Sequence, residues 1–385
     1  MGYFRNIKNS FKLKHYTNYI MVAAALVLLV VLSSLGVLGR SDLTLLHRIA
    51  YSIVLAVSLN LVVGFLGELS LGHAGFMCVG AYIGCYFAIG LSDVIGSPLL
   101  VMILSMLVGG LVAAVFGFII GLPALRLKGD YLAIVTLAFG EIVRNVFKNM
   151  KLFGGAMGMQ TYKISYDQKK LYIVSFLVVL VVLFLVQNLI RSKHGRAITA
   201  IRDNEIAAHA MGIGVTYYKL FVFVVAAFFA GVAGVMYGHQ VSLITQDTFS
   251  YNYSIEILVM VVLGGMGSIG GSILAATAIT YINFVLQNQF SGDLAALKLL
   301  IYAIVLILVV VFSNAPALKP LRERFNFKAL MRKITKSHKV PSNILDDEAE
   351  WNRVETKIKM DELLSVDFQN SRAYTPDKKP GKEDK

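Results

Sequence analysis

Charged residues are scarce in this chain. Asp, Glu, Lys and Arg together make up 15% of its 385 residues, whereas apolar residues make up 57%. Ordinary soluble domains hold about 25% charged residues, so this balance excludes a water-soluble fold. Apolar runs such as 19–38 and 171–190 are long enough to cross about 30 Å of hydrocarbon as helices. Because they do not alternate apolar and polar residues, a membrane barrel is excluded as well.

Cysteine is nearly absent. The only two, Cys78 and Cys85, lie seven residues apart in one apolar segment. That spacing places them about 10 Å apart along a helix, which is too far for a disulfide. Two thiols so spaced cannot form a metal site alone, so we expect both to pack among apolar neighbours. The sequence predicts neither a metal site nor a cofactor.

The hydrophobic runs predict an all-α, polytopic membrane protein of about ten transmembrane helices. We place these spans near residues 20–38, 46–66, 69–90, 98–122, 131–147, 171–190, 217–238, 253–271, 273–290 and 295–313. The eighth and ninth are candidates for half-helices. A basic leader precedes the first run, but a secretory signal peptide is rejected because the run is long and more membrane segments follow it.

Charge divides the chain into three parts. A basic leader (1–19) precedes the membrane domain (20–314), and a polar tail (315–385) follows it. Between residues 343 and 368 the tail predicts an amphipathic helix, and its last dozen residues have a disordered composition. We expect the tail to contact the membrane surface or a partner subunit, the alternative being a dispensable solvated extension. The net charge of +13 indicates topology and contact with membrane lipids, and without a recognition motif it does not indicate nucleic-acid binding.

The orientation follows from the positions of Lys and Arg. With ten spans, the leader, the 123–130 turn, the 191–219 loop and the tail all fall on one side, which the positive-inside rule assigns to the cytoplasm. Both termini are therefore predicted to be cytoplasmic. The 148–170 loop disagrees, because it carries five lysines but falls outside. Either this loop is an exception, or the weak span at 131–147 does not cross.

Two glycine-rich stretches resemble each other, GELSLGHAGF (67–76) and GMGSIGGSIL (265–274). Both contain G-x-x-S-[LI]-G, and both follow an apolar span that begins with a serine, Ser58 or Ser254. Such paired interruptions predict an internal repeat with discontinuous Gly-rich helices near the bilayer midplane. Helix ends there can meet a charged or zwitterionic solute. The alternative is that the glycines only let helices pack closely.

Three ionisable residues lie near these stretches, namely Glu68, His73 and Glu256. Charge within a span is costly and tends to mark an interior or water-filled face. The three residues therefore favour a pathway over simple packing. The alternative is that each lies at the end of a span and extends to the interface.

The 191–218 loop is the longest polar break between spans. Within it, DNEIAAHAM predicts a short helix with Asp203 or Asn204 as its N-cap, Glu205 in its first turn and Gly212 at its end. One face of this helix is expected to carry Ile206, Ala210 and Ile213. The surface is suited to a groove on another protein, the alternative being a solvated connector.

Several segments together resemble a known family. In order, LSLGHAGFMCVGAY, LRLKGDYLAIVTLAFGEIVRNV, GRAITAIRDNEIAAHAMGI, AFFAGVAGVMYGH and the GGMGSIGGSILAA region are similar to the LivM-type permease of branched-chain amino acid ABC importers. The likeness runs from about residue 49 to 311. EIAAHAMGI also looks like the E-x-A-A-x-x-x-G loop of ABC importer permeases, which docks on the ATPase. Here YYKLF replaces the apolar-Pro ending of the broader motif.

The resemblance implies the membrane-spanning permease subunit of an ATP-driven importer of leucine, isoleucine and valine in the prokaryotic plasma membrane. Its implied partners are a second, homologous permease (LivH type), two ABC ATPase subunits and an extracytoplasmic substrate-binding protein. The implied ATPase-coupling helix comprises Arg202, Asp203, Glu205, Ala207, Ala208 and Gly212. With the nearby acids, the implied translocation path comprises Gly67, Glu68, Ser70, Gly72, His73, Gly75, Glu256, Gly264, Gly265, Gly267 and Gly270.

Motifs that would power or catalyse a reaction are missing. The sequence contains no G-x-x-x-x-G-K-[ST] and no catalytic constellation, so we expect a transport subunit without its own ATPase site. One alternative is a permease of the same superfamily for urea or another small solute, such as a sugar. Another is an ion-coupled secondary transporter, which would need essential buried carboxylates.

Overall fold

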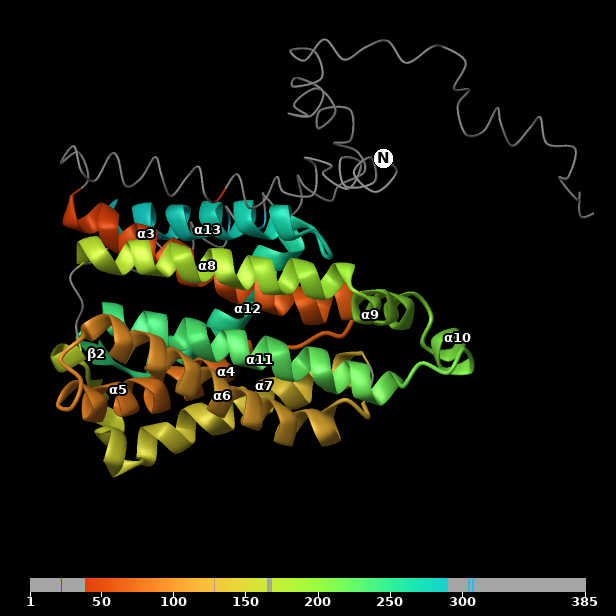
Figure 1. The fold of residues 1–385 in the computed structure, drawn as a ribbon, viewed down its shortest axis with the longest axis horizontal. Coiled ribbons are helices and arrows are strands. Elements are labelled where there is room, and N and C mark those ends of the chain that lie inside the picture. The colour runs from red at the N-terminus through yellow and green to blue at the C-terminus, as the bar shows by residue number, and fades with distance from the viewer. Residues whose placement is uncertain are drawn as a thin grey trace, which may run out of the picture. The chain divides into compact units, whose positions relative to one another are not determined.

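The computed structural model describes residues 39–127, 129–164 and 168–289, together with the single positions 22, 304 and 307. Helices dominate these ranges, and two short strands, β1 (Met159–Gln160) and β2 (Leu243–Ile244), pair antiparallel. The long helices run side by side (Figure 1). This arrangement satisfies backbone hydrogen bonds within each segment, as hydrocarbon requires.

The first half of the described chain holds α3 (Arg40–Asn60), its π-helical continuation η2 (Leu61–Leu66), α4 (His73–Val79), η3 (Gly80–Gly84), α5 (Cys85–Ser92), α6 (Pro98–Ala124) and α7 (Asp130–Asn149). The second half holds α8 (Gln168–Arg191), α9 (Lys193–Asp203), α10 (Glu205–Ala210), α11 (Val215–Gln240), α12 (Tyr251–Gly264) and α13 (Ile269–Gln289). Short 3-10 turns lie at Lys151–Phe153, Gly155–Met157, Tyr162–Ile164 and Gln246–Phe249.

Six helical segments in the described ranges are long and apolar enough to cross a membrane. They are Arg40–Leu66, His73–Ser92, Pro98–Ala124, Lys170–Arg191, Val215–Gln240 and Ile269–Gln287. Each overlaps a predicted span, and α12 is a shorter apolar helix of 14 residues. The predicted spans 20–38 and 295–313, the leader and the tail with its amphipathic helix lie outside the described residues. The chain is a multi-pass membrane protein, and the count of ten stays a prediction.

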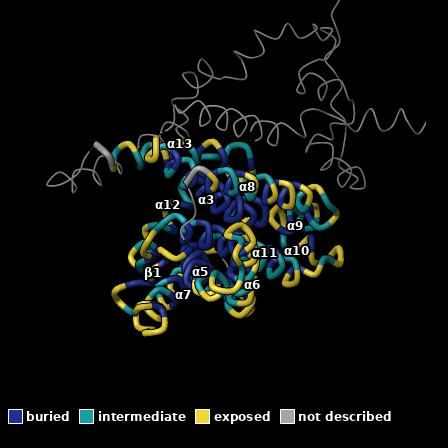
Figure 2. The backbone as a smooth tube through the Cα atoms, turned by 60° about the vertical axis from the view of Figure 1, so that its left-hand side comes forward, coloured by how far each residue is buried: buried dark blue, intermediate teal, exposed yellow. Residues whose placement is uncertain are grey.

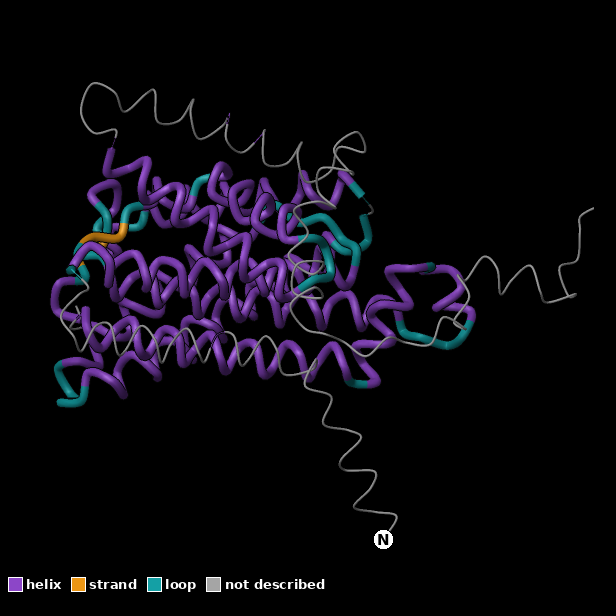
Figure 3. Tube along the Cα trace, turned by 90° about the horizontal axis from the view of Figure 1, so that it is seen from above, coloured by secondary structure: helices purple, strands orange, loops and turns teal. Residues whose placement is uncertain are grey.

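The loops gather at two ends of the bundle, which Figures 1 and 3 show from two directions. One end, here called the α10 end, holds residues 192–214. The opposite end, here called the β end, holds β1 and β2. Because Met159 pairs with Ile244, the described part of the lysine-rich loop, residues 148–164, lies at the β end. It therefore lies opposite α10, as the ten-span threading requires, and α7 connects the two ends.

Glycine allows α11 to touch the middle of the α4–α5 segment. A Cβ added to Gly80 would lie 2.2 Å from the carbonyl oxygen of Gly231, and one added to Gly234 would lie 2.1 Å from that of Met77. Backbone therefore meets backbone at this crossing. Figure 2 shows α3 largely buried, whereas the outer helices carry exposed positions. On α6 these are apolar, for example Leu111 and Ile119, as expected for a surface that faces lipid.

We predict that Gly80→Ala lowers the free energy of unfolding by about 1–3 kcal/mol, because its methyl group would overlap backbone that cannot rotate away. The readout is thermal unfolding of the detergent-solubilised protein. Gly90→Ala is the matched control, since Gly90 is helical and exposed with no atom near its added Cβ. Equal melting temperatures for the two variants would contradict the proposed crossing.

Candidate functional site

The first glycine-rich stretch interrupts two helices. The helix formed by α3 and η2 ends at Leu66, and Gly67 turns the chain with φ +82°. Residues 67–72, here called the re-entrant stretch, stay non-helical until α4 begins at His73. His73 Nε2 lies 2.7 Å from Ser58 Oγ. Since Ser58 precedes Leu66 by eight residues, α4 begins about 12 Å inside the bundle.

Side chains from other helices satisfy the backbone of this stretch. The N–H of Leu71 donates to Thr136 Oγ1 of α7 (3.0 Å), and the N–H of Ala74 donates to Ser254 Oγ of α12 (3.1 Å). The two serines that accompany the repeated glycine pattern, Ser58 and Ser254, therefore both contact the beginning of α4. A buried backbone break is stable only with such partners.

Close approach of the α7 backbone explains why two of the predicted path positions are glycines. A Cβ on Gly72 would lie 2.5 Å from the carbonyl oxygen of Thr136, and a Cβ on Gly75 would lie 2.7 Å from Cα of Gly140. Both positions press the beginning of α4 against α7. Ser70 lies in the same stretch, buried, and its hydroxyl has no hydrogen-bond partner among the described residues.

The second glycine-rich stretch is also a break, between α12 and α13 at residues 265–268. Gly265 and Gly267 both have positive φ. The N–H of Gly267 donates to Asn60 Oδ1 (2.9 Å), and Asn60 Nδ2 donates to Ser272 Oγ (3.0 Å). The predicted boundary between spans 253–271 and 273–290 is therefore wrong by several residues. The break coincides with the glycines of GGMGS (264–268), two of which have a positive φ.

Packing holds the second break against η2, the continuation of α3. A Cβ on Gly64 would lie 2.2 Å from the backbone nitrogen of Gly267, and one on Gly264 would lie 2.5 Å from the backbone of Gly271. Gly270 is the second residue of α13 and lies in its first turn. Both breaks thus lie next to the last turn of η2, at the α10 end.

The short helix predicted in the polar loop is α10. Asn204, one of the two predicted N-caps, accepts a hydrogen bond from the N–H of Ala207 (3.0 Å). Gly212 ends the helix with φ +79°, and the N–H of Ile213 donates to the carbonyl of Ala208 (3.1 Å). These bonds satisfy the free ends of the helix in the way a Schellman motif does.

The faces of α10 differ in exposure. Ala208 is buried against the bundle, whereas Ile206 is 80% exposed and the following Met211 is 82% exposed. Of the face predicted from spacing, Ile206 and Ala210 are exposed and Ile213 is half-buried. The helix therefore presents large apolar side chains away from the bundle.

Ionic and polar contacts join α10 and its neighbour α9 to the re-entrant stretch. Arg202 Nη1 donates to the carbonyl of Gly64 (3.1 Å), and Arg202 also pairs with Asp203. A Cβ on Gly67 would lie 2.7 Å from Cγ of Arg202. Residues predicted for coupling and for the path are thus in direct contact.

Lys219 was not predicted as a site residue. Its Nζ lies 2.5 Å from Glu68 Oε1 and 3.2 Å from Glu205 Oε1. The signal available in the sequence was a lysine inside the first turns of the apolar helix α11, where an unpaired charge is costly.

Glu256 does not join the other predicted path residues. Its Oε1 accepts a hydrogen bond from Asn283 Nδ2 (2.7 Å) and so links α12 to α13. Glu256 follows Ser254 by two residues, which turns it about 200° around the helix from the contact with α4. The structure therefore places it on a different face of α12.

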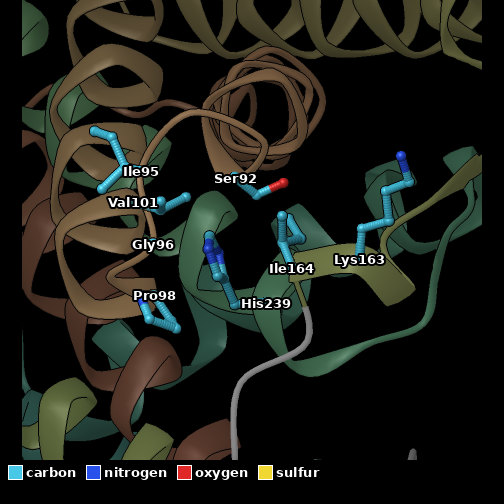
Figure 4. Close-up of a pocket in the computed structure, with 8 residues that line it drawn as sticks. All are labelled: Ser92, Ile95, Gly96, Pro98, Val101, Lys163, Ile164 and His239. Atoms are coloured by element: carbon cyan, nitrogen blue, oxygen red, sulfur yellow. The ribbon is translucent and has the colours of Figure 1, made fainter.

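A cavity of about 180 Å³ lies at the β end. It is lined by Ser92, Ile95, Gly96, Pro98, Val101, Lys163, Ile164 and His239 (Figure 4). None of the predicted path residues lines it. The cavity and the two glycine breaks are therefore separate features.

Apolar helices, a re-entrant stretch inside the bundle and a short capped helix at one end are features of a multi-pass membrane protein. The chain belongs to the family of permease components of branched-chain amino acid transport systems, whose model matches residues 43–310. The family resemblance inferred from the sequence is thereby confirmed.

The similar proteins carry related names. The chain is 33% identical over 312 residues to the high-affinity branched-chain amino acid transport system permease protein LivM of Salmonella typhimurium, covering 72% of this chain and 70% of that one. Identity to LivM of Escherichia coli is 32% over 330 residues, covering 77% and 73%. A probable LivM of Methanocaldococcus jannaschii is 27% identical over 269 residues, covering 61% and 78%. No solved structure matches the chain significantly.

We predict that Asn60→Leu loosens the second break. The variant leaves the N–H of Gly267 without its acceptor, at a cost of about 1–3 kcal/mol. Hydrogen exchange followed by mass spectrometry should show faster exchange in residues 265–268. Asn145→Leu is the control, because Asn145 is exposed on α7. Unchanged exchange at 265–268 would show that Asn60 does not hold the break.

Proposed function

We propose that this chain is the permease subunit of an ATP-driven ABC importer that moves leucine, isoleucine and valine across the prokaryotic plasma membrane. It would work with a second, homologous permease, two ABC ATPase subunits and an extracytoplasmic substrate-binding protein. The observation that carries this proposal is α10, a capped helix that exposes apolar side chains at one end of the bundle. The substrate class follows from the names of the relatives.

The exposed side of α10 supports a docking role. Ile206 and Met211 would be unfavourable in water, and exposed apolar surface commonly marks an interface with another protein. A solvated connector does not need the Asn204 cap and the Gly212 turn, which fix the helix in place. We therefore assign Arg202–Gly212 to the surface that meets the ATPase.

The breaks support a path for a zwitterion. The N-terminus of α4 follows the first break and contacts Ser254 of α12, and helix N-termini favour a carboxylate. The unpartnered hydroxyl of Ser70 offers a hydrogen bond there, because buried polar groups normally find a partner or water. Of the predicted path residues, those of the two breaks fit this path better than Glu256.

The topology follows from the same assignment. Arg191, Lys193, Arg196 and Arg202 gather near the α10 end, which the positive-inside rule makes cytoplasmic. With ten spans both termini would be cytoplasmic too. The two glycine breaks, each following a span with a matching serine, support an internal repeat.

Substrate choice has a direct test. In proteoliposomes that hold all the partner subunits, ATP should drive accumulation of radiolabelled leucine inside, and isoleucine and valine should compete. Urea should not compete. Accumulation driven by an ion gradient without ATP would favour a secondary transporter, and competition by urea alone would favour the other permease class.

The proposed docking role of α10 predicts the effect of a proline substitution in this helix. Ala208→Pro removes the hydrogen bond from the N–H of Ala208 to the carbonyl of Asn204 and breaks α10. ATP-driven uptake should be lost, and co-purification of the ATPase subunits should fall, while membrane insertion persists. Lys193→Pro is the matched control, because Lys193 is the first residue of α9, where proline is tolerated. Normal uptake by Ala208→Pro would remove α10 from the docking surface.

A further inference from the structure

We propose that Lys219 is a positioning residue that ties the docking helix to the re-entrant stretch, so that movement of α10 reaches the beginning of α4. The inference rests on the proposed function, in which partner ATPases move α10. It adds that the movement of α10 is transmitted to the proposed path through one buried ion cluster.

The cluster joins three separate elements. Lys219 comes from the first turns of α11, Glu68 from the re-entrant stretch, and Glu205 from the first turn of α10. One ammonium group has three donors, so it can meet both carboxylates at once. Lys219 pairs with Glu68 and with Glu205 and so connects two carboxylates that would otherwise repel each other.

Because most of this cluster is buried, separating its ion pairs is costly. The side chain of Lys219 is 4% exposed and that of Glu68 is 12% exposed, whereas Glu205 is 33% exposed. Exposed ion pairs separate at little cost. Removing one partner of a buried pair instead leaves a charge in a medium that solvates it poorly. Glu68 and Lys219 are therefore expected to move together, and Glu205 joins them to α10.

The distance from this cluster to the path is short. Glu68 precedes His73 by five residues, and the Leu71 N–H bond to Thr136 lies between them. A displacement of Glu68 would therefore move the backbone segment that positions the beginning of α4. The cluster lies between α10 and the re-entrant stretch. A movement of α10 would therefore be transmitted to this cluster before it affects the interior of the bundle.

A second contact runs in parallel. Arg202, the next-to-last residue of α9, bonds the carbonyl of Gly64 and covers Gly67. It stabilises the turn into the re-entrant stretch from the other side. Arg202 bonds a backbone carbonyl, whereas Lys219 pairs with acidic side chains of both the re-entrant stretch and α10.

The simplest alternative is that Lys219 only stabilises the fold. Two variants separate these roles. Lys219→Met leaves Glu68 buried without its cation and lowers stability by either account. The double variant Glu68→Gln/Lys219→Met removes the buried pair as a unit, so that only the more exposed Glu205 loses a partner. A structural role predicts that the double variant regains both stability and transport.

The test uses the full complex in proteoliposomes. The double variant should match the wild type in melting temperature and in co-purification of ATPase subunits. Its ATP-driven uptake should fall about tenfold, within the range of typical coupling effects, and the binding protein should no longer stimulate hydrolysis. Glu68→Gln alone changes the same proposed path residue but keeps the ion pair between Lys219 and Glu205, so it should retain most of the uptake. Lys219→Arg keeps both ion pairs and should retain most of the uptake. Lys193→Met is the matched control, because Lys193 is exposed at the same end.

Two results would overturn the inference. One is normal uptake by the double variant, and the other is loss of uptake together with loss of assembly, which would reduce Lys219 to a structural role. Neither result touches the proposed function, which is tested separately by ATP-driven uptake of leucine by the wild-type complex. The two proposals can therefore fail separately.

Discussion

A chain in hydrocarbon has to satisfy every backbone polar group within the protein, and this constraint governs the structure. The re-entrant stretch can leave helical geometry only because other helices supply its partners. Thr136 accepts the N–H of Leu71 in this stretch, and Ser254 accepts the N–H of Ala74 in the first turn of α4. Asn60 accepts the N–H of Gly267 in the second break. Each break is therefore held from a different helix, and a change in the packing of those helices is a change in the breaks.

Glycine has two roles in this bundle. At the crossing of α11 with Gly80 it brings backbones into contact and makes a rigid core. At Gly67 and Gly265–Gly267 it turns the chain between helices. The alternatives left open by the sequence, close packing or pathway, are thus both present at different positions. Both turning sites lie at the α10 end, next to the elements that we assign to docking.

Local rules predicted local features well. The position of α10, a cap at Asp203 or Asn204, a Gly212 ending and an interruption in the glycine-rich stretch 67–76 followed from short-range patterns. The long apolar helices did too, because length and hydropathy determine them. The predicted span 69–90, however, began four residues before α4, because residues 69–72 are not helical. Long-range contacts could not be predicted in this way. Nothing near Asn60 or Lys219 in the chain indicates that their partners lie at Gly267 and Glu68, and the register of the second break depended on one of these contacts.

The most direct measurement follows the re-entrant stretch while the ATPases act. Leu71, half-buried in that stretch, is replaced by cysteine in a protein whose two native, buried cysteines are changed to alanine. Its rate of reaction with a water-soluble thiol reagent is compared in the resting complex and after trapping the ATPases in the ATP-bound state. The account predicts a change of about tenfold. Equal rates in the two states would show that the stretch does not respond to the ATPases and would contradict the central claim.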